Sequence, residues 1–315
     1  MKLSLVISIE QALLTECLDS IRMQTVTDYE VLVLIEACNQ AHIDLCKHYA
    51  SLMPQHVSLM TRSTQCLEHT AIQQAKGTYI LFMKGTDIFS HPNALKEVFY
   101  AIEKEPDVII LPISACDDHG KLLWKQNLSN VEPQATIGGT YHQMLNQALL
   151  CPRVYCSCCK RSILIKHHLS YYPGVRLKAL YFMLVCCKFF HTYEMIQGPI
   201  YQPLRYPLIR PSKDHCLSDI LFLIEIFIKE QSDMEYDMKC FMEAYLMNLF
   251  EIAVLIYSDQ KDPSRYQWKK LCDCESLFHK EDRHLPISLK FVHCVKKFRA
   301  SDQKKIIDRI TMLQS

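Results

Sequence analysis

The first half of the chain alternates short apolar runs with stretches in which apolar residues recur every three or four positions. The runs are LSLVISI (3–9), EVLVLIE (30–36), QHVSLMT (55–61), YILFM (79–83) and DVIILPI (107–113). Such runs predict strands, and the spacing between them predicts helices. Because each connection is long enough for a right-handed crossover, we expect an α/β fold with a mostly parallel sheet covered on both faces.

The pattern changes twice along the chain, which predicts three parts. Residues 1–115 contain the alternation of strands and helices. Residues 116–212 are irregular, and Asp117-Asp118-His119-Gly120 predicts a turn between short strands. Residues 213–315 have a helical apolar period and predict a helical C-terminal region.

Composition narrows the class of protein. The chain has 315 residues, 49% of them hydrophobic, and a net charge of +1, which excludes a disordered chain and a generally nucleic-acid-coating protein. Seven glycines form neither of the Gly-rich phosphate-binding motifs. Sixteen cysteines without a signal peptide predict reduced thiols and a cytoplasmic location. No apolar stretch reaches the roughly 18 residues of a membrane span.

Several short motifs in the first half carry a resemblance to a known family. They are Leu18-Asp19-Ser20-Ile21, Gln24-Thr25, Asp28-Tyr29-Glu30 and Ala75-Lys76-Gly77 followed by Tyr79-Ile80-Leu81-Phe82. In order and spacing they resemble the nucleotide-sugar-binding domain of bacterial family 2 glycosyltransferases, which have the GT-A fold. The resemblance implies that residues 116–212 are an acceptor-side region completing that domain. It also implies inverting transfer of a sugar from a nucleotide-diphosphate donor to a glycan or similar acceptor.

The end of the fourth predicted strand departs from the family pattern. Family members hold a divalent cation there on Asp-x-Asp, whereas this chain has Lys84-Gly85-Thr86 followed by Asp87. An ammonium in place of a carboxylate changes the local charge by two units, each worth about 4 kcal/mol at 4 Å and an effective dielectric of 20. We therefore expect no metal bound in the usual way, and Mn²⁺ or Mg²⁺ only at a relocated site around Asp87. Lys84 beside the diphosphate would stabilise the departing nucleotide, the alternative being a solvated lysine.

Three other positions depart from the same pattern. Ile35-Glu36 occupies the position at which family members have a pair of Asp residues that contact the base and ribose. Glu36 can still accept hydrogen bonds. Glu68-His69-Thr70 occupies the position at which family members have Ala-Arg-Asn. Lys178-Ala179 occupies the position at which family members have Glu-Asp. The Asp of that pair is the general base in the family, and an alanine cannot accept a proton.

Other polar residues are candidates for the same site. Asp117 and Asp118, with His119, are expected to line the cleft beyond the carboxyl ends of the strands, although each is also an ordinary turn residue. A replacement base is expected among His167, His168 and His191, which titrate near neutral pH. The alternative for these histidines is a place at a helix end, where they interact with the helix dipole.

The C-terminal segment is strongly basic. Residues 283–315 contain eight Lys or Arg and two Asp, a net charge of +6, together with apolar stripes of helical spacing. They predict basic amphipathic helices that contact an anionic membrane peripherally, or helices that pack on the protein with their lysines in water.

Two functions remain open from the sequence. One is a metal-independent glycosyltransferase with Glu36, Lys84, Asp87, Asp117 and Asp118 near the nucleotide sugar. The other is a catalytically inactive relative that acts as a scaffold or as the partner subunit of an active glycosyltransferase. Nucleic acid is not expected as a partner in either case.

Overall fold

The structure is a computed structural model of the chain. It describes residues 1–9, 14–35, 40–53, 57–61, 66–116, 122–126, 128–147, 157–172, 177–198, 200–203, 213–231, 233–258 and 264–280. The strands are β1 (Leu3–Ser8), β2 (Tyr29–Ile35), β3 (Val57–Thr61), β4 (Tyr79–Lys84), β5 (Asp87–Phe89), β6 (Val108–Ile110), β7 (Ser114–Cys116), β8 (Leu122–Lys125), β9 (Ser157–Lys160), β10 (Tyr193–Met195) and β11 (Tyr201–Pro203). The helices are α1 (Leu14–Arg22), α2 (Gln40–Leu52), α3 (Leu67–Gln74), α4 (Ala94–Ile102), α5 (Ile137–Asn146), α6 (Arg161–Lys166), α7 (Lys178–Cys187), α8 (Lys213–Lys229), α9 (Tyr236–Ser258) and α10 (Arg265–Lys280).

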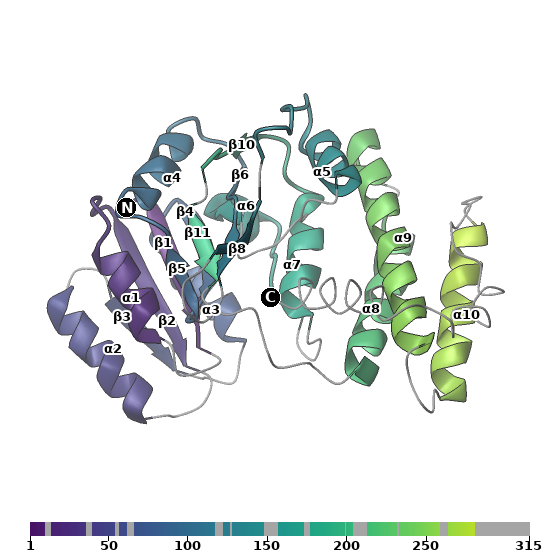
Figure 1. The fold of residues 1–315 in the computed structure, drawn as a ribbon, viewed down its shortest axis with the longest axis horizontal. Helices are drawn as coiled ribbons and strands as arrows, with labels where there is room; N and C mark the ends of the chain where they lie inside the picture. The colour runs from purple at the N-terminus through teal and green to yellow at the C-terminus, as the bar shows by residue number, and fades with distance from the viewer. Residues whose placement is uncertain are drawn as a thin grey trace.

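The described core is a seven-stranded sheet with the order β10-β6-β9-β4-β1-β2-β3. Strand β9 pairs antiparallel with both of its neighbours, and the other pairings are parallel. Helices lie on both sides of the sheet, and α8, α9 and α10 stand beside it (Figure 1). The five runs predicted as strands are β1, β2, β3, β4 and β6, so the mostly parallel α/β sheet and the helical C-terminal region are confirmed.

The burial of the central strands explains the apolar runs in the sequence. Every residue of β2 is buried, and Leu3, Leu5 and Ile7 of β1 are fully buried. A parallel strand covered on both faces needs such a continuous apolar run. In α1 the buried residues Leu14, Cys17, Leu18 and Ile21 form the single apolar stripe that a helix covering one face requires.

Strands from the middle part of the chain extend the sheet. Strands β9 and β10 join β4 and β6, and β11 pairs antiparallel with β5. The turn predicted at 117–120 is flanked by β7 and β8, but those four residues lie outside the described part of the chain. Residues 116–212 thus supply strands to the same sheet that residues 1–115 begin.

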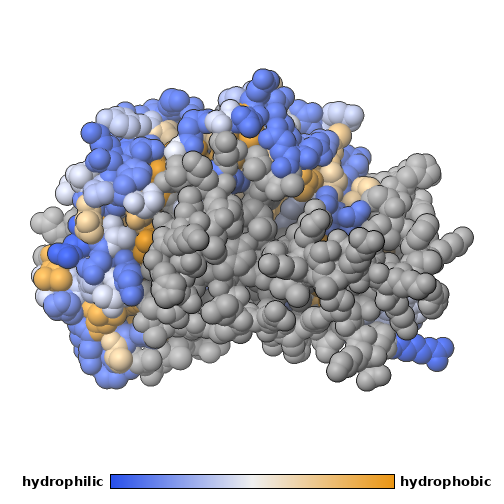
Figure 2. All heavy atoms as spheres, viewed as in Figure 1, coloured by the Kyte–Doolittle hydropathy of each residue, from blue (hydrophilic) through white to orange (hydrophobic). Residues whose placement is uncertain are grey.

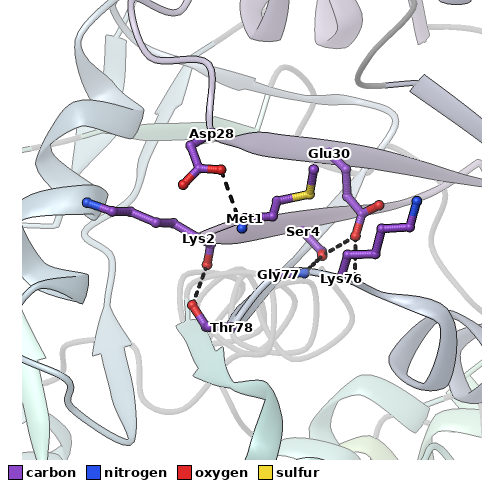
Figure 3. Close-up of polar contacts among 8 residues, drawn as sticks. All are labelled: Met1, Lys2, Ser4, Asp28, Glu30, Lys76, Gly77 and Thr78. Atoms are coloured by element: carbon purple, nitrogen blue, oxygen red, sulfur yellow. Dashed lines mark hydrogen bonds and ion pairs between the residues drawn. The ribbon is translucent and has the colours of Figure 1, made fainter.

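A buried carboxylate ties the amino ends of three strands together (Figure 3). Glu30 of β2 is 5% exposed and accepts hydrogen bonds from the Ser4 hydroxyl at 2.6 Å and from the Lys76 backbone N–H at 2.5 Å. The Ser4 hydroxyl oxygen in turn accepts from the Gly77 N–H at 2.9 Å. Because its charge is met by hydrogen bonds, Glu30 can remain buried while it connects β1, β2 and the start of β4.

An ion pair joins α3 to α7. The Lys178 ammonium lies 2.5 Å from Oε1 of Glu68, and the two side chains are 29% and 6% exposed. The Cys66 thiol donates to the other oxygen of Glu68 at 2.9 Å. Burial alone would raise the pKa of Glu68, but the hydrogen bonds from Cys66 and Lys178 and the charge of Lys178 outweigh it and lower that pKa. Glu68 is therefore ionised at neutral pH.

The helical C-terminal region packs against the middle part of the chain. The Thr136 hydroxyl, which caps α5, donates to Asp237 of α9 at 2.6 Å. No helix in the described part of the chain is long and apolar enough to cross a membrane. The described surface in Figure 2 is mainly hydrophilic, with hydrophobic residues in small groups.

Replacement of Gly77 by Ala tests the close approach of β4 to β1. An added Cβ would lie 2.5 Å from the Leu3 carbonyl carbon and closer still to the Ser4 nitrogen, and neither backbone atom can move without shifting β1. We expect Gly77→Ala to lower the free energy of unfolding by about 2 to 4 kcal/mol in urea denaturation. Gly198→Ala is the control, since its nearest neighbour would be an ordinary contact at 3.8 Å. Equal stability of both variants would contradict the packing argument.

Replacement of Lys178 by Met tests the ion pair through its pH dependence. A lowered pKa means that Glu68 stabilises the fold above pH about 4.3, its unfolded pKa, and that this contribution is lost as pH falls. We expect Lys178→Met to cost about 1 to 3 kcal/mol at pH 7, because it leaves a buried carboxylate unpaired, and less at pH 4. Lys2→Met, which breaks an exposed pair with Glu103, should cost under about 1 kcal/mol at both pH values. A deficit of Lys178→Met that did not shrink with pH would contradict the assignment.

Candidate functional site

The candidate site is the edge of the sheet at which β1, β2 and β4 end, called here the carboxyl edge. Ser8 pairs in register with Leu34 of β2 and with Lys84 of β4, so the three strands end together. Ligands of open α/β sheets bind beyond this edge. Because α3 connects the parallel strands β3 and β4, its first turn lies at the same edge.

A buried carboxylate holds the turn that follows β4. Asp87 is 3% exposed, and its Oδ2 accepts from the Lys84 N–H at 3.0 Å. The Gly85 N–H donates to the Ser8 carbonyl at 2.9 Å, which fastens the turn to β1. Burial, and after it the charge of Asp87, raises the pKa of the neighbouring Cys17 thiol. Asp87 thus lies beneath the turn, and Lys84 is the residue that the turn presents, partly exposed, at the carboxyl edge.

The face of the sheet on which Lys84 lies is covered by α7. Side chains two residues apart in a strand share a face, so Phe82 and Lys84 point the same way. The Phe82 ring lies 5.6 Å from the Tyr171 ring and 5.5 Å from the Phe182 ring of α7. The Lys178 ammonium lies 6.0 Å from the centre of the Tyr171 ring. The first turn of α7 therefore stands at the carboxyl edge, on the same face as Lys84.

Two of the departures from the family pattern meet at this edge. Glu68 and Lys178, at the two unusual motifs, form the ion pair between α3 and α7. Next to Glu68, the Nδ1 atom of His69 is buried and has no hydrogen-bond partner among the described residues. Residue-by-residue reasoning missed this pair, and the signal that could have found it is the opposite charge of the two substituted positions.

Several predicted residues cannot be placed. Glu36, Asp117, Asp118 and His119 lie outside the described residues, and so does the basic segment 283–315. Within the described part of the chain, no group of three or more His, Cys, Asp or Glu side chains is placed to hold a metal ion.

His191 lies at the opposite edge of the sheet from Lys84. Its backbone N–H donates to Oδ2 of Asp107 at 2.8 Å, and Asp107 directly precedes β6. Its ring Nδ1 lies 2.8 Å from Oε1 of Glu235, and the histidine side chain is 62% exposed. The length of α7 separates His191 from the carboxyl edge, so the structure does not bring it to Lys84.

The other two candidate histidines are at a helix end. His167 follows the last residue of α6, and its ring stacks on Phe189 at 4.1 Å. Phe189 comes after the last turn of α7, and a ten-residue helix is about 15 Å long. His168 is exposed, with a φ of 52°. The structure thus supports the alternative of a helix-end position, and it brings neither histidine to Lys84.

The comparison with a curated protein covers part of each sequence. The Poly(ribitol-phosphate) beta-glucosyltransferase of Bacillus spizizenii is 26% identical to this chain over 143 residues. The matched segment is 42% of this chain and 22% of that protein, so the likeness concerns a minor part of the relative.

Solved structures are similar over nearly the whole chain. Residues 1–349 of S. aureus TarS in complex with UDP-GlcNAc superpose with a TM-score of 0.68 and 13% identity, covering 100% of this chain and 90% of that one. The mannosyltransferase PcManGT from Pyrobaculum calidifontis, in complex with GDP-Man and Mn²⁺, gives a TM-score of 0.57 at 11% identity, covering 99% and 85%. At such identities the likeness shows the fold, which is the GT-A fold.

A sequence profile decides the family. The profile described as Glycosyl transferase family 2 matches residues 6–168, more than half of the chain and all of β2, β3, β4 and β6. The matched segment contains both Lys84 and Glu68 of the carboxyl edge. The chain therefore belongs to glycosyl transferase family 2.

Proposed function

We propose that this chain transfers a sugar from a nucleotide-diphosphate donor to a hydroxyl group of a glycan or similar acceptor, without a divalent cation at the end of β4. The observation that carries the proposal is Lys84, presented at the carboxyl edge by the turn above Asp87. Membership of the family supports sugar transfer. The structural neighbours bind UDP-GlcNAc and GDP-Man, which supports a nucleotide-sugar donor.

Lys84 is suited to the leaving group of this reaction. As the bond to the sugar breaks, negative charge develops on the nucleoside diphosphate, and a fixed cation beside it lowers the energy of that state. An ammonium is a compact charge that binds phosphate oxygens well. The backbone on both sides of Lys84 is held by Asp87 and Ser8, so the Lys84 side chain extends from a fixed position in the turn.

The acceptor is proposed at the level of its reacting group. The curated relative is named for poly(ribitol-phosphate), a polymer that carries hydroxyl groups. That name supports a hydroxyl-rich acceptor for this chain. Three further expectations stay predictions. They are a place for Glu36 beside the nucleotide, a partner glycosyltransferase, and membrane contact through residues 283–315.

Nucleotide binding tests the proposal directly. The protein is titrated by calorimetry with UDP, GDP, CMP and dTDP, each with and without Mn²⁺. We expect one of the nucleoside diphosphates to bind with micromolar affinity, and we expect this affinity to be unchanged by Mn²⁺. The physical reason is that Lys84 supplies the positive charge that a metal supplies elsewhere. Binding that required Mn²⁺ would contradict metal independence. Absence of binding by all four nucleotides would favour the inactive scaffold instead.

Removal of the Lys84 charge tests its role. We expect Lys84→Ala to weaken binding of the preferred nucleoside diphosphate by about tenfold or more, since a loss of about 1.4 kcal/mol corresponds to that factor. Binding of the nucleoside without phosphates should not change. The matched control is Lys76→Ala, an exposed lysine near the start of β4 at the opposite edge. An equal loss for nucleoside and nucleoside diphosphate would show that Lys84 does not act on the phosphates.

A further inference from the structure

Three aromatic residues that are open to solvent lie in contact beside α7. The centre of the Tyr172 ring lies 5.3 Å from that of the Tyr181 ring of α7 and 5.4 Å from that of the Phe222 ring of α8. Tyr172 is 43% exposed, and Tyr181 and Phe222 are partly exposed. The three rings are called here the aromatic platform. They come from three separate segments of the chain, so only the folded protein brings them together.

Parallel packing of α7 and α8 makes two of these rings neighbours (Figure 1). The Leu177 N–H, directly before α7, donates to Oδ2 of Asp219 at 3.1 Å, and the Lys188 ammonium, directly after α7, lies 3.2 Å from Oε2 of Glu230. Both pairs are separated by 42 residues along the chain. A constant offset means that the two helices run side by side in the same direction, with the platform between the two contacts.

The packing behind the platform holds Tyr172 in place. The preceding residue, Tyr171, is 3% exposed and stacks on Phe182 of α7 with 4.5 Å between the ring centres. The Tyr171 ring also contacts Phe82 of β4. Because Tyr171 is fixed between the sheet and α7, the position of Tyr172 at the surface is fixed as well. A ring that is ordered before a ligand arrives loses little conformational freedom on binding.

The two tyrosines of the platform also offer hydroxyl groups. Neither the Tyr172 nor the Tyr181 hydroxyl has a hydrogen-bond partner among the described residues. The buried Tyr29 and Tyr79, in contrast, donate to backbone carbonyls. Burial, and after it the charge of Glu230, raises the pKa of Tyr181. Its hydroxyl is therefore protonated at neutral pH and can both donate and accept a hydrogen bond.

The platform begins within one helical turn of the carboxyl edge. Lys178, in the first turn of α7, pairs with Glu68 of α3 at that edge. Tyr181 comes three residues later, an advance of about 4.5 Å along the helix. The Lys178 ammonium also lies 6.0 Å from the ring centre of Tyr171, the residue before Tyr172. A ligand of several sugar units is therefore long enough to reach both the carboxyl edge and the platform.

The lysines at the two ends of α7 are paired with carboxylates. Lys178 pairs with Glu68, and Lys188 pairs with Glu230. Tyr181 lies between these two pairs on the same helix. Recognition at the platform is therefore expected to depend on ring faces and hydroxyl groups rather than on the charge of the ligand.

We propose that the aromatic platform binds neutral sugar rings of the acceptor, a proposal that rests on the function proposed above and names the acceptor class as a neutral saccharide chain. A pyranose ring carries C–H groups on its faces and hydroxyl groups around its rim. The C–H groups pack on the electron-rich face of an aromatic ring, and the hydroxyl groups exchange hydrogen bonds with Tyr172 and Tyr181. The reacting sugar unit lies toward the carboxyl edge, and the units before it lie on the platform.

Titration of the full chain with neutral oligosaccharides, followed by saturation-transfer NMR, tests the proposal. The probes are cellotetraose, maltotetraose and chitotetraose, and glycerol phosphate is the charged comparison. We expect at least one oligosaccharide to bind, and Tyr172→Ala to weaken that binding by about three- to tenfold, the factor that one aromatic contact supplies. Tyr172→Trp, which has a larger ring face, should retain the binding. The affinity for UDP should be the same in every variant.

Two further variants make the result specific. Tyr172→Leu keeps an apolar side chain against Tyr181 and Phe222 but removes the aromatic face, so it should weaken binding as Tyr172→Ala does. It also takes the place of Tyr172→Ala if that variant lowers the melting temperature. Tyr100→Ala removes a ring that is 57% exposed on α4 and should leave oligosaccharide binding unchanged.

The outcomes separate this proposal from the proposed function. UDP binding without binding of any oligosaccharide overturns the platform as a saccharide site and leaves the proposed function standing. Oligosaccharide binding that neither Tyr172→Ala nor Tyr172→Leu weakens also overturns it, and so does a preference for glycerol phosphate. Oligosaccharide binding that depends on Tyr172, in a protein that binds no nucleotide, overturns the proposed function but supports the saccharide site.

Discussion

The parallel pairing of β1 with both β2 and β4 is the constraint on which the other features depend. At the amino ends, Glu30 accepts from Ser4 and from the backbone of Lys76, and only a glycine at position 77 allows β4 to start so close to β1. A shift of one residue would turn every buried side chain of these strands to the other face. At the opposite ends the same register brings Ser8 and Lys84 to a common edge, and the candidate site is built there.

The charges at the carboxyl edge are rearranged in compensating pairs. Asp87 is buried and accepts a hydrogen bond from the Lys84 N–H, and Glu68 neutralises Lys178. A buried charge without a partner would cost several kcal/mol, so the buried carboxylate of Glu68 depends on Lys178. The Glu68–Lys178 pair keeps α3 and α7 in contact across the edge, and Lys84 lies partly exposed in the turn after β4. The proposed role of Lys84 rests on its position in this edge, at the end of β4.

The helical C-terminal region takes part in the same edge. Because α8 runs parallel to α7 in constant register, its early residues lie beside the first turn of α7, and Asp219 contacts the Leu177 N–H. The three parts of the chain are therefore connected at the first turn of α7, where Lys178 pairs with Glu68 and the Leu177 N–H donates to Asp219.

The sequence by itself determined the strands β1, β2, β3, β4 and β6, the helical C-terminal region and the fold class, because the apolar periods of strands and helices are local properties of the chain. It also placed Lys84 at the end of β4, since that position follows from the strand alone. The sequence left two positions open for the three histidines, a base at the site or a helix end, because nearness in sequence does not say at which end of α7 a residue lies. The Glu68–Lys178 pair and the position of Asp219 were decided only by the tertiary structure. Both depend on how separate elements pack against each other, and the register between elements leaves no local pattern in the sequence.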